Sequence, residues 1–247
     1  MARERLDKLL AARGIGSRKE VGQQIRSGQV TVNGAICRDP ASKVEAAQDT
    51  VCVMGAPIRA RKERYFMLNK PAGVISATED TAHQTVLELF PESERTGLAP
   101  VGRLDKDTVG LLLVTDDGAL NHALTAPRRH VDKRYRALVS GKLAADAQEQ
   151  FAQGVLLRDG TVCRPAELTI AETDAAGLTT VEVVLQEGKY HQVKRMIAAL
   201  GGHVERLERL SVGPIVLDTN LAQGEYRELT EAELQALFSA CKGLRQP

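Results

Sequence analysis

The chain has 247 residues, of which 43% are hydrophobic and 26% are charged, and its formal net charge is +1. This composition is typical of a globular protein with one or two domains, and no run of about 18 apolar residues is present to form a membrane helix. The four cysteines are far apart and predict neither a disulfide framework nor a zinc site. Together with the lack of a secretory signal pattern, they predict a cytoplasmic protein.

The charge is distributed unevenly along the chain. Residues 1–64 contain 13 lysines and arginines against 7 acidic residues, whereas residues 65–247 contain 20 against 25. A basic head on a mildly acidic body indicates that the head meets a polyanion. Charge alone leaves a second interpretation open, in which the head is only an unevenly charged, solvated surface.

Residues 1–56 are predicted to form a helix–helix–hairpin domain. Leucines at helical spacing predict a short helix that ends at Gly14, and Ser17 with Glu20 has the capping-box pattern of a second helix. Asn33-Gly34 is typical of a two-residue hairpin turn. The basic residues expected to point outward and contact phosphates are Arg5, Lys8, Arg18, Lys19 and Arg26.

The charged segment 57–64 lacks periodicity and is predicted to be a linker to a second domain over residues 65–247. Two short apolar runs in this domain predict buried strands, and two amphipathic segments predict helices. These elements are strands over 109–114 and 181–185 and helices over 192–200 and 231–237. No internal repeat or low-complexity segment interrupts them.

The segment Gly102–Thr108 places two carboxylates and two lysine or arginine side chains directly before a predicted buried strand. A carboxylate at the rim of a core strand can be held rigidly and aimed into a cleft. From the chemistry alone, a polar turn is the more common explanation, and a carboxylate pair is also typical of glycoside hydrolysis. The chain lacks histidine spacings typical of metal sites and glycine-rich phosphate loops.

The head resembles the S4 family of RNA-binding domains. The residues that carry the resemblance are Arg5-Leu6-Asp7-Lys8, Gly16-Ser17-Arg18 and the stretch from Gly28 to Gly34. This resemblance implies docking on structured RNA through shape and backbone contacts. A helical cap that merely covers the second domain is the alternative, which the excess of positive charge disfavours.

Four motifs of the body resemble the pseudouridine synthases of the RsuA type. They are Tyr65–Gly73, Gly102–Gly118, Lys133–Tyr135 and Glu187–Met196, in the order that the family has. The resemblance extends from about Arg5 to Leu237. It implies an α+β fold with a small S4-type helix–hairpin domain and a catalytic domain whose mostly antiparallel mixed sheet is flanked by helices.

The resemblance also implies an enzyme that detaches uracil from C1′ of its ribose, turns the base over and rejoins it through C5, with no cofactor or metal. Asp105 matches the catalytic carboxylate, and Lys194 matches the basic partner that keeps a carboxylate charged. Tyr135 matches an active-site tyrosine that stacks on uracil. Arg103 matches a residue that fills the gap left by the flipped base or grips its phosphate.

Further residues are expected to support RNA binding, while Asp107 is expected to be structural. Lys70 is expected to support its motif or the RNA backbone, with a role in the sheet equally compatible. Leu210 is expected to line the uracil pocket. Phosphate contacts that offset the cost of base extraction are expected from Arg128, Arg129 and Lys133.

The form of the last motif predicts the target. Large-subunit relatives tend to carry asparagine where Tyr190 stands and arginine where Lys194 stands, so the resemblance points to a single uridine of 16S rRNA. The expected form of the substrate is a small-subunit assembly intermediate, and a monomer is the default expectation for the oligomeric state. A synthase acting on 23S rRNA is the first alternative. A non-catalytic S4-domain assembly factor and a glycosidic-bond hydrolase using Asp105 and Asp107 are the others.

Overall fold

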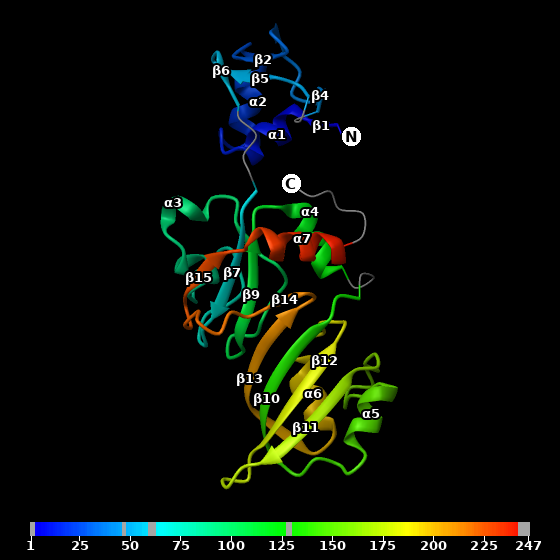
Figure 1. Ribbon diagram of the computed structural model, residues 1–247. Helices are drawn as coiled ribbons and strands as arrows, with labels where there is room; N and C mark the ends of the chain where they lie inside the picture. The colour runs from blue at the N-terminus through cyan, green and yellow to red at the C-terminus, as the bar shows by residue number, and fades with distance from the viewer. Residues whose placement is uncertain (1–2, 46–47, 59–62, 127–129, 242–247) are drawn as a thin grey trace. The chain divides into compact units, whose positions relative to one another are not determined.

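The computed structural model describes residues 3–45, 48–58, 63–126 and 130–241 (Figure 1). The chain divides between Glu63 and Arg64 into two compact units, each described here by itself. The division falls within the segment predicted as a linker. No helix in the described part of the chain is long and apolar enough to cross a membrane.

The first unit has two helices beside a small antiparallel sheet of strand order β3-β2-β5-β6 and a short β1–β4 pair. Leu6, Leu10 and Ile25 are completely buried in its core. The predicted capping box is confirmed, since the Ser17 side chain accepts from the backbone N–H of Glu20. The elements are β1 (Glu4–Arg5), α1 (Leu6–Ala12), α2 (Arg18–Arg26), β2 (Val30–Val32), β3 (Ala35–Ile36), β4 (Lys43–Val44), β5 (Val51–Val53) and β6 (Ala56–Pro57).

The predicted hairpin turn of this unit is also confirmed. Asn33 and Gly34 connect β2 to β3 with φ values of 51° and 84°. A two-residue turn with both central residues in the left-handed region matches the twist of the flanking strands. Asn33 is held there because its side chain donates to Asp49 and accepts from the backbone N–H of Thr50.

The second unit has a nine-stranded mixed sheet, with a main strand order of β11-β12-β10-β13-β9-β7-β15 (Figure 1). Strands β8 and β14 pair at its side with β9 and β13. The elements are β7 (Tyr65–Lys70), the 3-10 helix η1 (Val86–Leu89), α3 (Glu92–Arg95), β8 (Ala99–Pro100), β9 (Val109–Thr115), α4 (Gly118–Thr125), β10 (Lys133–Gly141), α5 (Ala147–Gln153), β11 (Glu167–Thr173), β12 (Thr179–Leu185), α6 (Gln192–Ala199), β13 (Gly202–Val212), β14 (Ile215–Val216), β15 (Tyr226–Glu228) and α7 (Glu231–Ala240).

Among the strand pairs of the described residues, β9 and β13 alone run parallel. They meet where Gly110 lies opposite Arg209. Gly110 has a φ of 98°, and a Cβ atom there would lie 2.4 Å from the carbonyl oxygen of Arg209. Only glycine fits this close approach of two backbones, so the residue directly after Val109 is fixed by the sheet.

Both faces of the central strands are covered, because β7 and β9 are buried along their whole length. Phe66 and Leu112 belong to one core cluster, which also holds side chains of α5 and α6. Met67 and Leu113 belong to a second cluster with side chains of α4 and α7. Successive strand residues point to opposite faces, which explains this division. The expected α+β fold with a mixed, mostly antiparallel sheet is confirmed.

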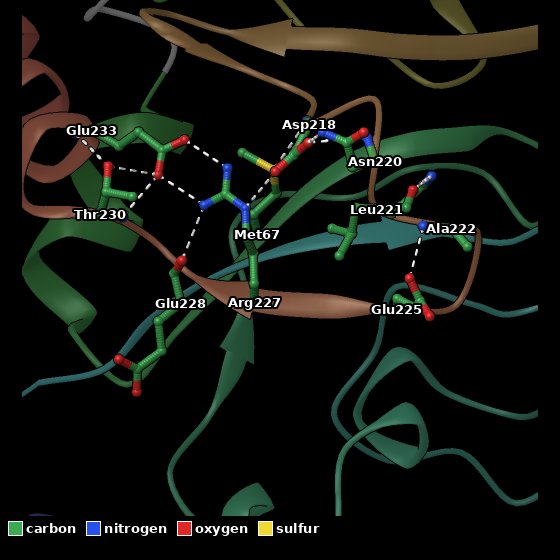
Figure 2. A network of polar contacts seen from close by, with 11 residues as sticks. Met67, Asp218, Asn220, Leu221, Ala222, Glu225, Arg227, Glu228, Thr230 and Glu233 are labelled. Atoms are coloured by element: carbon green, nitrogen blue, oxygen red, sulfur yellow. Dashed lines mark hydrogen bonds and ion pairs between the residues drawn. The ribbon is translucent and has the colours of Figure 1, made fainter.

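A polar network fastens the edge strand β15 to the start of α7. Figure 2 shows Arg227 between two carboxylates: its Nε donates to Asp218 at 2.9 Å, and its two terminal nitrogens donate to Glu233 at 2.9 Å each. Glu233 also accepts from the backbone N–H of Thr230, as the predicted capping box requires. The hydrogen bonds from Arg227 hold the pKa of Glu233 down at about 2.

We expect Arg227→Met to lower the free energy of unfolding at neutral pH by about 1–3 kcal/mol, because charge-assisted hydrogen bonds are lost. Since folding lowers the pKa of Glu233 from 4.5 to about 2, this stabilisation is complete above 4.5 and disappears as the pH falls towards 2. Denaturant unfolding at several pH values measures the difference. Arg206→Met, at an exposed strand position, is the control. A difference that is independent of pH would contradict this assignment.

Candidate active site

A cavity of about 670 Å³ lies in the second unit. Its wall is formed by the loop before β9, by β10 and β13, and by the segment that leads into α6. A second space of about 70 Å³ shares Arg103, Asp105, Tyr135 and His191 with it. Residues of three motifs singled out in the sequence therefore line the same cavity. Arg103 and His191, which both line it, are 88 residues apart in the chain.

Asp105 lies in the loop that leads into β9. The loop is fixed on both sides of it: the Ser76 hydroxyl bonds both backbone groups of Leu104 at 3.0 Å, and the Lys106 carbonyl accepts from Gly73 at 2.8 Å. The Asp105 side chain is 28% exposed and lines both spaces. A nucleophile or base must be held in a fixed position and still be accessible to the substrate, and a partly exposed carboxylate on a rigid backbone satisfies both conditions.

Lys194, from α6, lies between two carboxylates. Its Nζ is 3.8 Å from Asp105 and 2.5 Å from Asp107. The ammonium was expected beside Asp105, but its hydrogen bond goes to Asp107, which holds the pKa of that carboxyl below its usual range. Arg103 is exposed and forms no hydrogen bond or ion pair with the described residues, so its side chain is available to a substrate.

Lys70 lies completely buried at the end of β7, beneath the loop that carries Asp105. Its ammonium donates to the carbonyl oxygens of Pro71 at 2.9 Å, Lys106 at 3.3 Å and Thr108 at 2.9 Å. Burial lowers its pKa to about 8, although Asp107 and Asp105 favour the charged form. The expected contact between Lys70 and RNA is therefore corrected: the side chain reaches no surface and instead supports the loop.

Tyr135 is 8% exposed on β10 and lines both spaces with Asp105. The expectation for Leu210 is corrected, because Leu210 lies outside the walls of both. Leu207, Arg209 and Val212 of β13 line these spaces, whereas Leu210 lies where the pairing of β13 with β10 shifts register. The expectation named the right strand, but this residue does not reach either space.

Two residues of the site were missed at the level of sequence. His191 has a left-handed backbone (φ 49°), stacks on Tyr190 with ring centroids 3.8 Å apart, and places Nε2 3.7 Å from Asp105. Its position within the Glu187–Met196 motif was the available signal. Arg209 is buried on β13 and lines the larger cavity. Nothing in its local sequence marked it, because its burial depends on β9 and β10.

The basic residues of the first unit lie on its surface. Lys8, Lys19 and Arg26 are exposed, and Arg5 and Arg18 both contact the buried Asp7. Arg5 donates to Asp7 at 2.8 and 3.0 Å, and this lowers the pKa of Asp7 to about 2. Asp7 thus stays ionised and orients two arginines that remain partly open to a phosphate.

Two predicted contacts, Arg128 and Arg129, lie outside the described residues. No group of three histidine, cysteine or acidic side chains in the described part of the chain is arranged to hold a metal ion. Lys133 is half-buried on the wall of the larger cavity. The arrangement offers the Asp105 carboxylate, an aromatic wall and several cations to a polyanionic substrate.

Comparison with known proteins agrees with this geometry. Residues 64–199 match the family model of RNA pseudouridylate synthases, and residues 4–51 match the S4 domain. The chain is 44% identical over 235 residues to ribosomal small subunit pseudouridine synthase A of Escherichia coli, covering 94% of this chain and 99% of that protein. It is 45% identical over 234 residues to the uncharacterized RNA pseudouridine synthase YtzG of Bacillus subtilis, covering 94% and 98%.

The fold agrees as well. A crystal structure described as a pseudouridylate synthase superimposes with a TM-score of 0.68 at 35% identity, covering 95% of this chain and 99% of that one. The family match includes the loop of Asp105, the strand of Tyr135 and the helix of Lys194. The chain therefore belongs to the RNA pseudouridylate synthase family and is an enzyme of that family that also carries an S4 domain.

Proposed function

We propose that this protein converts a uridine of 16S ribosomal RNA to pseudouridine. The observation that carries the proposal is that Asp105 and Tyr135, from separate motifs, line the same two hollows, with Lys194 3.8 Å from the carboxylate. A carboxylate between an aromatic wall and cations suits chemistry at the glycosidic bond of a flipped nucleotide.

Each residue has a role in this proposal. The RNA delivers an extruded uridine, Tyr135 packs against the base, and Asp105 acts as the nucleophile or base while uracil leaves C1′ and reattaches through C5. Lys194, 3.8 Å from the carboxylate, orients it by charge attraction. Arg103 is free to enter the gap that the base leaves in the RNA or to grip its phosphate.

The small-subunit target is supported by the relative in Escherichia coli, which is named as acting on the small subunit and aligns over nearly the full length of both chains. Two residues typical of the small-subunit form lie close to Asp105. Lys194 is 3.8 Å from its carboxylate, and Tyr190 stacks on His191, which is 3.7 Å from it. A small-subunit assembly intermediate is the proposed substrate and the monomer the proposed state. The S4 domain supplies sequence-independent affinity.

The proposal is tested by tritium release from C5-labelled 16S and 23S transcripts, each with and without small-subunit ribosomal proteins. C5 must lose its hydrogen when it becomes the glycosidic carbon, so stoichiometric release from 16S RNA is expected. Release from 23S RNA alone would keep the chemistry and overturn the target. Free uracil would favour a hydrolase, and no release from any form would favour a non-catalytic assembly factor.

The role of the S4 domain is tested by reversing the charges of Arg18 and Lys19. We expect Arg18→Glu with Lys19→Glu to weaken RNA binding at least tenfold and to lower the slope of log affinity against log salt by roughly 1.5, because about two phosphate contacts disappear. Filter binding between low and moderate salt measures both quantities. The thermal unfolding midpoint of the variant is measured as well, because Arg18 also contacts Asp7, and binding is compared at a temperature at which both proteins are folded. Unchanged affinity and slope would contradict an RNA-binding head.

A further inference from the structure

The larger cavity contains a buried cation with unused hydrogen-bonding capacity. Arg209 is 3% exposed, and its Nε donates to the Leu111 carbonyl at 2.8 Å. One of its terminal nitrogens is buried and has no hydrogen-bond partner among the described residues. A guanidinium stays charged in proteins, so a buried N–H of this group without an acceptor is costly. Such a group is stabilised when an anion enters.

A second cation lies close to it on the neighbouring strand. Lys133 is half-buried and donates to the Val131 carbonyl at 3.1 Å. Burial lowers the pKa of Lys133, and the charge of Arg209 lowers it further. Two positive charges that repel each other on the same cavity wall create a site of strongly positive potential in an apolar surrounding.

The carboxylates of the cavity do not neutralise this pair. Glu187 is engaged by Lys189 at 3.1 Å and by the backbone N–H of Arg164. Asp105 has the Lys194 ammonium at 3.8 Å and the His191 ring at 3.7 Å as its nearest basic neighbours. Asp132 favours the charged form of Lys133, but it is exposed and accepts a hydrogen bond from Gln186. The side chains with positive charge on the wall are Arg103, Lys106, Lys133, Lys189 and Arg209, and those with negative charge are Asp105 and Glu187.

We propose that Arg209 and Lys133 form a phosphate subsite that receives the 5′-phosphate of the extruded uridine. Arg209 pairs with Tyr135 across β10 and β13, which sets the subsite beside the wall expected to hold the base. This inference rests on the proposed function. A phosphate of stacked RNA cannot reach a residue that is 97% buried. The subsite therefore adds favourable binding free energy only when the nucleotide is extruded.

The test compares 5′-UMP with uridine as probes in NMR titrations of the full-length ¹⁵N-labelled protein. The wild type is expected to bind 5′-UMP about tenfold or more tightly than uridine, because charge-assisted hydrogen bonds form only with the nucleotide. Arg209→Gln and Lys133→Gln are expected to bring the two affinities within about twofold, with uridine binding retained. Arg209→Lys keeps part of the preference because it keeps the charge. Lys142→Gln, at an exposed position outside the cavity, keeps all of it.

Equal binding of 5′-UMP and uridine by the wild type, or binding of neither, would overturn the subsite. So would a preference that survives in Lys133→Gln, which is the informative variant if Arg209→Gln does not fold. Competition by inorganic phosphate against 5′-UMP, and not against uridine, is a further expected result. Tritium release separates this inference from the function: turnover without a preference for 5′-UMP overturns only the subsite, and a preference without turnover overturns only the function.

Discussion

Asp105→Asn is expected to reduce pseudouridine formation by about 10⁴-fold or more, with the fold retained. The amide has almost the same shape as the carboxylate but lacks the charge needed to act as a nucleophile or base. The Asp105 side chain is 28% exposed, and the nearest side-chain nitrogens, on His191 and Lys194, lie at 3.7 and 3.8 Å, beyond hydrogen-bond distance. Stability should therefore change by no more than about 0.5 kcal/mol.

Single-turnover tritium release measures the effect, together with the unfolding midpoint and the RNA affinity of the same variant. Asp107→Asn is the matched control, because it removes the other carboxylate that contacts Lys194. A synthase that depends on Asp105 alone stays active in this control. A glycosidic-bond hydrolase built on both carboxylates loses activity in both variants and releases free uracil. Normal turnover by the Asp105→Asn variant would contradict the proposed mechanism.

Lys70→Met is expected to lower both stability and turnover, although Lys70 contacts no substrate. Three backbone carbonyls lose their donor, at a cost of about 1–3 kcal/mol for each one that stays buried without a partner. Two of them, on Lys106 and Thr108, belong to the loop that holds Asp105. A displacement of that carboxylate by about 1 Å is enough to cost roughly 10²-fold in kcat.

Denaturant unfolding and tritium release measure the two effects, and Lys142→Met, at an exposed lysine, is the control for the loss of charge. RNA affinity should be unchanged in Lys70→Met, because the side chain is completely buried. A variant that weakens RNA binding and leaves kcat unchanged would restore the RNA-contact interpretation and contradict the supporting role.

The pKa of Lys70 gives an independent pH readout. Folding lowers this pKa from 10.5 to about 8, so between these values the unfolded chain binds more protons than the folded one. The free energy of unfolding therefore rises with pH across this window relative to Lys70→Met. The gain in the free energy of unfolding that comes from the lowered pKa of Lys70 is largest above pH 10.5 and is lost as the pH falls through 8. An equal pH dependence of wild type and variant would contradict the burial of a titrating ammonium.

The sequence by itself determined several local elements, and its motifs indicated the residues that are proposed to carry the chemistry. The Ser17–Glu20 and Thr230–Glu233 boxes, the Asn33-Gly34 turn and the buried run of β9 depend on neighbours within a few residues, and all are present in the structure. The resemblance of the motifs to a known family then supplied the family and the mixed sheet, since periodicity specifies no strand order.

Only the tertiary structure decided which side chains line the cavity and which support the loop that carries Asp105. Lys70 and Arg209 are cations that any local pattern places on the surface, yet contacts over 36 and 98 residues of sequence bury both. Arg209 lines the larger cavity and its neighbour Leu210 does not, and the two lie where the pairing of β13 with β10 shifts register. The physical reason is the same in each case: burial and pairing arise where distant strands meet, and local sequence spacing does not record those meetings.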